Sequence, residues 1–354
     1  MDECGRYFID RAKQKGWQVE VNEQAVAGNP VSITINPEAK GAPVILSGHI
    51  DTVHPAGLFG YPCVRIEGNK IYGPGVADCK GGAVAGFMAM DALERAGFKD
   101  RPVTLVLQTD EETGSRQSKK KTVEYMCAKA KGAVAFLNLE GMGRTKEGAS
   151  RITVARKGIE RLLIKVYGKE AHASNCAIDG ANAIVQASRM IVELDKLKDH
   201  DGVTCNIGTI KGGSVSNTVA GYCEFEIDTR YSTFQQREEL LAYVNKVVNT
   251  TFVEGTTATV EVASQRIAME LKEANILLAE KINKIICKHG IAPLQTGKEG
   301  GGSDAAYITD AGVPCVDSVG VTGGDCHSVK EYAYVDSLLK SAKIQALTCA
   351  FIEE

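Results

Sequence analysis

The sequence predicts an α/β protein in which a mostly parallel central sheet is accompanied by an inserted ferredoxin-like α+β domain. The chain has 354 residues, which is enough for two domains at about 150 residues each. In the first 150 residues, short apolar runs alternate with helical patterns, as is typical of a parallel α/β sheet. From about Arg151 the pattern changes to the order β-α-β-β-α-β, which is typical of a ferredoxin-like unit.

Three predicted strands of the first part end in side chains that bind metals or protons. The strands and the polar residues that follow them are 44–46 with His49 and Asp51, 103–108 with Asp110, Glu111 and Glu112, and 133–139 with Glu140. A helix is predicted at 83–96, because its apolar residues have helical spacing and Gly97 can end it. Since the loops after parallel strands converge outside their carboxyl ends, we expect these side chains to meet in one crevice.

The second part contains the predicted ferredoxin-like elements, after which the chain returns to the first part. The predicted elements are strands at 162–167, 203–210, 222–230 and 257–263, helices at 180–197 and 234–248, and, after residue 268, a helix at 275–289, a Gly-rich loop at 300–303 and a strand at 313–316. We therefore expect one domain formed by residues 1–150 and 266–354, and an inserted domain formed by residues 151–265.

Composition and charge exclude several classes of partner. The 41 Lys and Arg residues nearly balance the 44 Asp and Glu residues, and the net charge of −3 gives no sign of a surface for nucleic acid or an anionic membrane. No apolar run approaches the roughly 18 residues that span a bilayer, and the N-terminus does not resemble a signal peptide. The 11 cysteines include no C-x-x-C pair, which favours reduced thiols. We expect a cytoplasmic protein that acts on a small molecule.

Each polar motif also has a simpler explanation when it is taken alone. His49 and Asp51 form an H-x-D pair, in which a carboxylate can orient a metal-bound imidazole, but a structural histidine is the simpler explanation. Asp78 lies in the Gly-rich segment 73–82, which is also typical of a tight loop before a helix and lacks the motifs of phosphate-binding loops. The run Asp110-Glu111-Glu112 needs a cation or solvation, because adjacent carboxylates repel one another.

Together, these residues have the composition of a site for two divalent metal ions. The set contains two histidines and three carboxylates: His49, Asp78, Glu112, Glu140 and His327. Two divalent cations carry four positive charges, which three carboxylates and one bridging hydroxide neutralise. If Asp78 bridges, each ion has three protein ligands and an open position, which is the stoichiometry of catalytic rather than structural zinc.

The motifs follow one another in the order of a known family. They are Gly48-His49-Ile50-Asp51-Thr52-Val53, Gly73-Pro74-Gly75-x-x-Asp78-x-Lys80-Gly81-Gly82, Asp110-Glu111-Glu112-x-Gly114-Ser115, Gly300-Gly301-Gly302-Ser303-Asp304 and His327-Ser328. The chain resembles the M20 metallopeptidases, a dizinc group that includes glutamate carboxypeptidase, aminoacylase, acetylornithine deacetylase and succinyl-diaminopimelate desuccinylase. The resemblance implies an α/β/α zinc-peptidase domain as the catalytic part, and a lid and dimerisation domain as the insert.

The resemblance further implies two Zn²⁺ ions per chain, which Co²⁺ or Mn²⁺ can replace. By this resemblance, His49 and Glu140 would hold one ion. Glu112 and His327 would hold the other, and Asp78 would bridge the two.

Catalytic residues are implied in the same way. Glu111 would be the general base that takes a proton from the attacking water and returns it to the leaving nitrogen, and Asp51 would orient His49. His172 and Asn217 would stabilise the oxyanion, although without the resemblance a surface-loop histidine is the simpler explanation of His172. A substrate carboxylate would be bound by Arg230 with the loop residues Gly301, Gly302 and Ser303. An arginine fork suits a carboxylate, and a structural ion pair is the alternative for this arginine.

The implied function is hydrolysis of a peptide or N-acyl amide bond in a small substrate. Glu140 stands where aminopeptidases of the family usually have Asp, which favours a carboxypeptidase or an N-acyl-amino-acid deacylase. A tripeptidase-like aminopeptidase is the first alternative. A metal-binding regulatory protein without catalysis is the second, and the intact Glu111 argues against it. The resemblance also implies a homodimer formed through the inserted domain.

Overall fold

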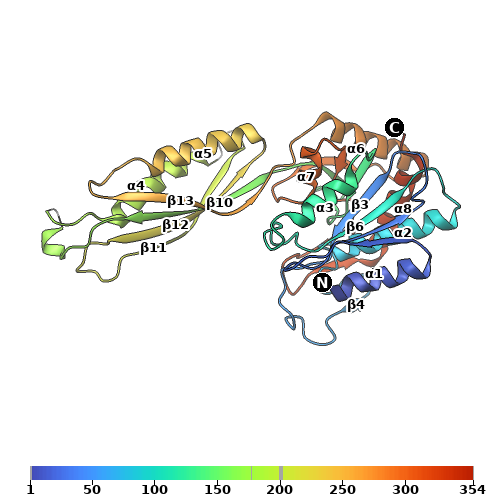
Figure 1. The fold of residues 1–354 in the computed structure, drawn as a ribbon, viewed down its shortest axis with the longest axis horizontal. Helices are drawn as coiled ribbons and strands as arrows, with labels where there is room; N and C mark the ends of the chain where they lie inside the picture. Colours follow the sequence, from blue (N-terminus) through green and yellow to red (C-terminus); the bar gives the residue numbers. More distant parts are fainter. Residues whose placement is uncertain (1, 177, 199–201, 354) are drawn as a thin grey trace. The chain divides into compact units, whose positions relative to one another are not determined.

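The computed structural model describes residues 2–176, 178–198 and 202–353 (Figure 1). Within these ranges the chain forms two compact units, each with its own hydrophobic core. Unit 1 consists of the described residues of 1–155, 271–298 and 303–354, and unit 2 of those of 156–270 and 299–302. The helices in the described part of the chain are too short or too polar to cross a lipid bilayer.

The central sheet of unit 1 is mixed and mostly parallel. In spatial order its strands are β1 (Gln18–Val21), β2 (Val31–Ile35), β6 (Val103–Gln108), β3 (Val44–His49), β7 (Ala135–Asn138) and β15 (Cys315–Val316). Strands β6, β3, β7 and β15 pair in parallel, whereas β1 and β2 form an antiparallel edge. Every residue of β3, β6 and β7 is buried, because a parallel sheet is covered on both faces.

Helices cover both faces of this sheet. They are α1 (Asp2–Gln14), α2 (Lys80–Arg95), α3 (Lys121–Ala130), α6 (Glu273–Lys288), α7 (Ala305–Asp310) and α8 (Val335–Phe351). Successive side chains of β3 point to opposite faces, since the Ser47 hydroxyl contacts the Met126 sulfur of α3 whereas Gly48 faces Ala83 of α2. The result is a three-layer α/β/α arrangement (Figure 1).

Two glycines let α2 pack directly on the main chain of its neighbours. A Cβ at Gly82 would collide with the carbonyl oxygen of Leu139, and a Cβ at Gly81 would collide with that of Val76. The first turn of α2 therefore touches both the end of β7 and the loop that carries Asp78. This close approach explains the Gly-Gly pair that ends the Asp78 motif.

Two small sheets join the loops of unit 1. One contains β14 (Gln295–Glu299), β9 (Ser150–Arg156) and β8 (Gly143–Arg144), and the other contains β16 (Gly323–Gly324), β17 (Tyr332–Tyr334), β5 (Lys70–Tyr72) and β4 (Arg65–Glu67). Strands β17 and β5 pair antiparallel, with Tyr332 opposite Tyr72. This pairing brings the loop after β5, which carries Asp78, beside the loop before β17, which carries His327.

Unit 2 combines an antiparallel sheet with helices in ferredoxin-like order. Its elements are β10 (Gly158–Tyr167), η1 (Ala173–Asn175), α4 (Ala183–Leu194), η2 (Asp195–Leu197), β11 (Thr204–Gly212), β12 (Tyr222–Tyr231), α5 (Phe234–Val248) and β13 (Thr257–Arg266). The strands lie in the order β11-β12-β10-β13 and pair antiparallel. Side-chain oxygens of Asn182 and Thr233 cap the first turns of α4 and α5. The predicted fold class, an α/β sheet with an inserted ferredoxin-like α+β domain, is confirmed.

Candidate metal centre and active site

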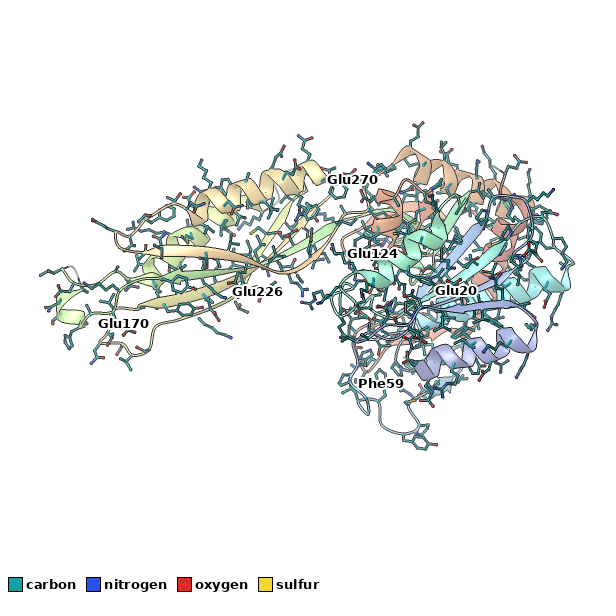
Figure 2. The ribbon with its side chains drawn as sticks, in the orientation of Figure 1. Glu20, Phe59, Glu124, Glu170, Glu226 and Glu270 are labelled. Carbon is teal, nitrogen blue, oxygen red and sulfur yellow. The ribbon has the colours of Figure 1, made fainter. Side chains whose placement is uncertain are left out.

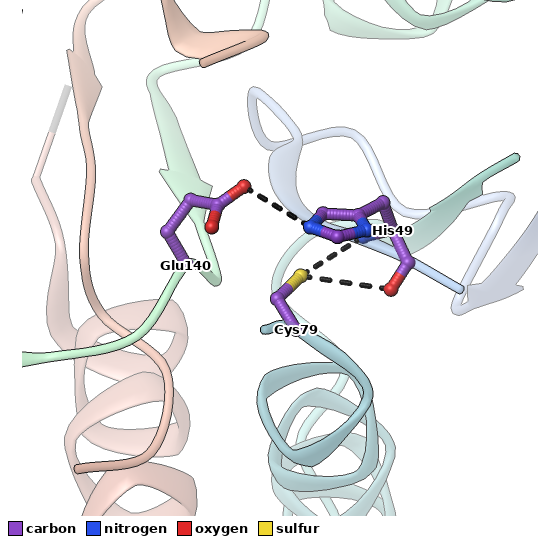
Figure 3. Close-up of side chains that lie close together, drawn as sticks. All are labelled: His49, Cys79 and Glu140. Carbon is purple, nitrogen blue, oxygen red and sulfur yellow. Dashed lines mark hydrogen bonds and ion pairs between the residues drawn. The ribbon is translucent and has the colours of Figure 1, made fainter. Parts of the chain in front are cut away.

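The structure brings the five side chains of the predicted metal site together in unit 1. His49 ends β3, Glu112 follows β6 and Glu140 follows β7, so these three come from the carboxyl ends of neighbouring parallel strands. Asp78 lies in the loop before α2, and His327 lies in the loop between β16 and β17. Figure 3 shows the carboxylate of Glu140 facing the ring of His49.

The carboxylate of Asp78 lies between two imidazoles. Its Oδ1 atom is 3.0 Å from Nε2 of His49, and its Oδ2 atom is 3.1 Å from Nε2 of His327. Glu140 Oε1 lies 3.6 Å from the same His49 nitrogen, and Glu112 Oε2 lies 3.4 Å from the same His327 nitrogen. The side chains therefore form two groups that share Asp78, which is the arrangement that a bridging carboxylate requires.

Asp51 contacts the other side of the His49 ring. Nδ1 of His49 is 3.1 Å from the main-chain oxygen of Asp51 and 3.5 Å from its carboxylate Oδ1. The second carboxylate oxygen, Oδ2, accepts the N–H of Glu112 at 2.9 Å. Burial acts to raise the pKa of Asp51, but the hydrogen bonds from His49 and from the Glu112 N–H outweigh it and leave this pKa below its ordinary value. Asp51 is thus in contact with one predicted ligand and with the main chain of another.

The carboxylates of this cluster crowd one another, and burial and their mutual charge move their pKa values in different directions. Burial, followed by the charge of Asp78, raises the pKa of Glu112 to about 7. Burial also raises the pKa of Glu140 well above its ordinary value. At Asp78, burial is outweighed by hydrogen bonds from the two imidazoles, which hold the pKa well below its ordinary value. A divalent cation removes the cost of this crowding, so the donor set fits a metal site.

Glu111 lies beside the same cluster. It follows β6 and keeps 9% of its surface exposed. Its negative charge acts on the pKa values of Glu112, Glu140 and His327, which places its carboxylate near both groups of predicted ligands. This position suits a general base, and the role itself stays a prediction.

The residues of the predicted carboxylate-binding loop are divided between the two units. In unit 1, Ser303 is buried and its hydroxyl donates to the carboxylate of Asp317. In unit 2, the carbonyl oxygen of Gly301 accepts a hydrogen bond from Arg156 at 3.3 Å, and Gly302 leaves no room for a Cβ. Their role in binding substrate stays a prediction.

Arg230 forms an ion pair within unit 2. Its Nε donates to Oδ1 of Asp228 at 2.6 Å, and its Nη2 donates to Oδ2 at 3.1 Å. Its Nη1 donates to the carbonyl oxygen of Gly300 at 3.4 Å. This is the structural ion pair that was the alternative to a substrate-binding arginine, and the substrate role stays a prediction.

His172 and Asn217 lie side by side at one edge of unit 2. The carbonyl oxygen of Asn217 accepts the N–H of Ala173 at 2.9 Å, and His172 forms a β-bridge with Thr218. Nδ1 of His172 is 2.8 Å from the hydroxyl of Ser174. Both side chains are exposed, and their predicted role at the oxyanion is untested.

Comparison with known proteins decides the family. The model of peptidase family M20/M25/M40 matches residues 45–350 of the chain. The chain belongs to this family. It is therefore an enzyme of the metallopeptidase and amidohydrolase class, and its family is metal-dependent. The family predicted from the motifs is confirmed.

Curated relatives of this M20 chain include a carboxypeptidase and a desuccinylase. Carboxypeptidase G2 of Pseudomonas sp. (strain RS-16) is 29% identical over 337 residues, which cover 94% of this chain and 79% of the relative. Succinyl-diaminopimelate desuccinylase of Stenotrophomonas maltophilia is 26% identical over 349 residues, which cover 95% of this chain and 90% of the relative.

Solved structures show the same fold. The aminopeptidase PepT from Bacillus cereus has a TM-score of 0.78 at 20% identity, and the match covers 98% of this chain and 91% of that chain. The M20 family metallo-carboxypeptidase Sso-CP2 from Sulfolobus solfataricus has a TM-score of 0.73 at 17% identity, and the match covers 99% of this chain and 94% of that chain. At these identities the likeness concerns the fold alone.

Cys79 lies beside the candidate metal site, and the sequence analysis missed it. Its sulfur accepts the main-chain N–H of His49 at 3.0 Å and lies 3.6 Å from the main-chain oxygen of the same residue (Figure 3). Ligand atoms of Cys79, His49 and Glu140 lie within 4.8 Å of one another. Burial raises the pKa of the Cys79 thiol, which therefore stays protonated against the main chain. In the sequence this position is only a spacer between Asp78 and Lys80, and no local signal distinguishes it.

Proposed function

We propose that this M20 enzyme is a dizinc hydrolase that cleaves a peptide or N-acyl amide bond of a small substrate. The observation that carries the proposal is the position of Asp78, whose two carboxylate oxygens lie 3.0 and 3.1 Å from imidazole nitrogens of His49 and His327. A structural histidine or a solvated acidic turn does not require this convergence. Imidazole and carboxylate donors suit zinc, and they also accept cobalt or manganese.

In this proposal the two groups of side chains hold one ion each. His49 and Glu140 would hold the first, Glu112 and His327 would hold the second, and Asp78 would be shared between them. When bound, the two ions make a water molecule more acidic and polarise the scissile carbonyl.

The proton transfers are assigned to Glu111. Its carboxylate takes a proton from the attacking water and delivers it to the nitrogen that leaves as the C–N bond breaks. Asp51 keeps the His49 ring turned so that Nε2 faces the cluster, because Nδ1 faces Asp51. His172 and Asn217 of unit 2 are assigned to the oxyanion that forms from the substrate carbonyl.

The substrate class proposed is that of a carboxypeptidase or N-acyl-amino-acid deacylase. Sequence similarity supports it, since carboxypeptidase G2 and a desuccinylase align with nearly the whole chain. A tripeptidase-like aminopeptidase is the second candidate, because an aminopeptidase PepT and a tripeptidase from Staphylococcus aureus both reach a TM-score of 0.78. The first candidate is preferred, since a likeness of fold at 20% and 22% identity carries no substrate.

Metal content and a substrate panel test the proposal together. The protein is loaded with zinc, its metal content per chain is measured, and it is assayed with peptides ending in glutamate, N-acyl amino acids and unblocked tripeptides. We expect two zinc ions per chain and cleavage of the first or second class. Release of an N-terminal residue from the tripeptide alone would select the aminopeptidase. A zinc-loaded protein that is inert on the whole panel would support the regulatory alternative instead.

Unit 2 is assigned the roles of lid and dimerisation surface. Light scattering of the full chain tests the second role, with a mass of about twice 37.8 kDa as the expected result. A monomer at assay concentration would contradict it and would leave the metal site unaffected.

A further inference from the structure

Glu331 is a buried carboxylate to which the proposed reaction assigns no role. It lies between β16 and β17 and keeps only 1% of its surface exposed. Its Oε1 atom accepts the N–H of Ala77 at 2.9 Å and the N–H of Asp78 at 3.1 Å. Its Oε2 atom accepts the N–H of Gly75 at 3.0 Å and lies 3.3 Å from Nε2 of His54. Four polar groups therefore surround one carboxylate.

These contacts fasten the loop 73–78 to a single side chain. A buried negative charge is costly unless several donors surround it, and three main-chain N–H groups supply most of what Glu331 needs. The main chain adds a further contact, since the carbonyl oxygen of Glu331 accepts the N–H of Gly73 at 3.3 Å. The N–H groups in turn depend on this carboxylate, because buried donors without an acceptor are destabilising.

The same carboxylate connects three loops of the proposed site. The bonded loop carries Asp78, and the loop of His327 ends at Glu331. His54 belongs to the loop that follows β3, and its ring packs edge-on against Phe59, labelled in Figure 2, with 4.9 Å between ring centres. Glu331 thus lies where the segments that supply the two imidazole groups and their shared carboxylate meet.

We propose that Glu331 is a positioning residue that sets where Asp78 stands between His49 and His327. The inference rests on the proposed metal site. The main-chain N–H of Asp78 is bonded to Glu331 while its carboxylate faces both imidazoles, so a shift of this loop moves both Asp78 oxygens together. Such a shift would weaken zinc binding by both groups of side chains. Arg230 and the loop 301–303, which are predicted to bind the substrate carboxylate, are not part of the loop 73–78.

The variant Glu331→Gln tests this inference. Glutamine has nearly the same shape as glutamate, but an NH₂ group, which donates hydrogen bonds, replaces one of the carboxylate oxygens that accept them. Zinc affinity is measured on the folded protein by competition with a chromogenic chelator, and kinetics are measured at saturating zinc. We expect zinc affinity to fall by about 10- to 100-fold, the usual effect of losing a residue that orients a ligand. We expect kcat to fall by at least about tenfold while KM stays within about threefold. A folded variant with wild-type zinc affinity and kcat would overturn the inference.

Glu331→Asp is the second variant, and it decides the question if the glutamine variant does not fold. It keeps the charge but shortens the side chain, so it cannot reach all the donors. We expect the same direction of change with a smaller loss of zinc affinity, and wild-type affinity and kcat here would also overturn the inference. Glu160→Gln is the matched control, since it removes another buried glutamate charge, in unit 2. We expect it to lower the melting temperature without changing zinc affinity.

Asp78→Asn separates this inference from the proposed function. If Asp78→Asn keeps both ions with wild-type affinity, the proposed metal site is wrong. If Asp78→Asn loses zinc while both Glu331 variants keep it, the metal site stands and only the role of Glu331 is wrong.

Discussion

Buried charged side chains have different partners in the two units. In unit 2, the buried carboxylate of Glu160 is matched by Arg237, whose Nε and Nη2 donate to its two oxygens at 2.7 and 3.2 Å. In unit 1, the carboxylates of Asp78, Glu112 and Glu140 share two imidazoles and crowd one another, and the pKa of Glu112 rises to about 7. The pair in unit 2 is complete within the protein, whereas the cluster in unit 1 has the donor groups of a metal site.

Sheet topology explains why the carboxylates gather in unit 1. In unit 1 the parallel strands β3, β6 and β7 end at the same edge, so the polar residues that follow them converge. In the antiparallel sheet of unit 2, neighbouring strands end at opposite edges, so residues after successive strands do not meet. A charge with a matched partner stabilises a fold, whereas a crowded set of titratable groups is typical of a functional site.

The largest expected effect is that of Glu111→Gln in unit 1. Because the general base would be lost while the predicted ligands stay, we expect kcat to fall by about 10²- to 10⁴-fold with zinc content unchanged. Metal analysis and steady-state kinetics on the same sample measure both. His49→Ala is the comparison, and we expect it to lose metal as well as activity. Equal metal depletion in the two variants would contradict this separation of roles.

A large loss of stability is expected from Glu160→Gln in unit 2. The change leaves Arg237 without its full ionic partner, and we expect the free energy of unfolding to fall by about 3 kcal/mol. Urea unfolding measures it. The matched control is Glu261→Gln, which removes the partly exposed pair with Lys165 and should cost less than about 1 kcal/mol. Equal losses in the two variants would remove the distinction between the buried pair and the exposed pair.

Removal of zinc tests whether metal stabilises unit 1 independently of the ion pair in unit 2. A ligand that binds only the folded state stabilises it by about 2.7 kcal/mol when its concentration is 100 times the dissociation constant. We therefore expect a chelator to lower the melting temperature of the zinc-loaded protein, and zinc added back to restore it. Glu160→Gln should show the same shift on chelation, because its defect lies in unit 2. A melting temperature that does not change when the chelator is added would argue against metal in unit 1.

The smallest expected effect is the change in stability at acidic pH caused by Asp228→Asn in unit 2. Burial acts to raise the pKa of Asp228, but hydrogen bonds from Arg230 and Arg161 outweigh it and lower this pKa below 3.8. A lowered folded-state pKa contributes stability that is complete above the unfolded value and is lost as the pH falls through the folded value. We expect Asp228→Asn to be less stable than wild type at about pH 5 by less than about 1 kcal/mol, and the difference to shrink below pH 3.8. A difference between the urea midpoints of Asp228→Asn and wild type that stays constant down to about pH 2 would contradict this.

Much of the fold and part of the site could be predicted from local patterns. Strands β3, β6 and β7 are apolar throughout because both faces are buried, and the polar residues after them mark their ends. The pair of Asp228 and Arg230 also has a local signal, since residues two apart on a strand share a face. The contacts of Cys79 and Glu331 have no such signal, because their partners lie far away along the chain.

By itself, the sequence determined the fold class, the peptidase family and the kinds of donor atom that unit 1 offers to a metal. These follow from local apolar patterns and from motifs of a few residues. Only the tertiary structure decided that Asp78 stands between His49 and His327 and that Glu331 holds its loop. The reason is physical: the loops come from distant parts of the chain, and the pairing of β17 with β5 and the packing of α2 on the sheet place them together.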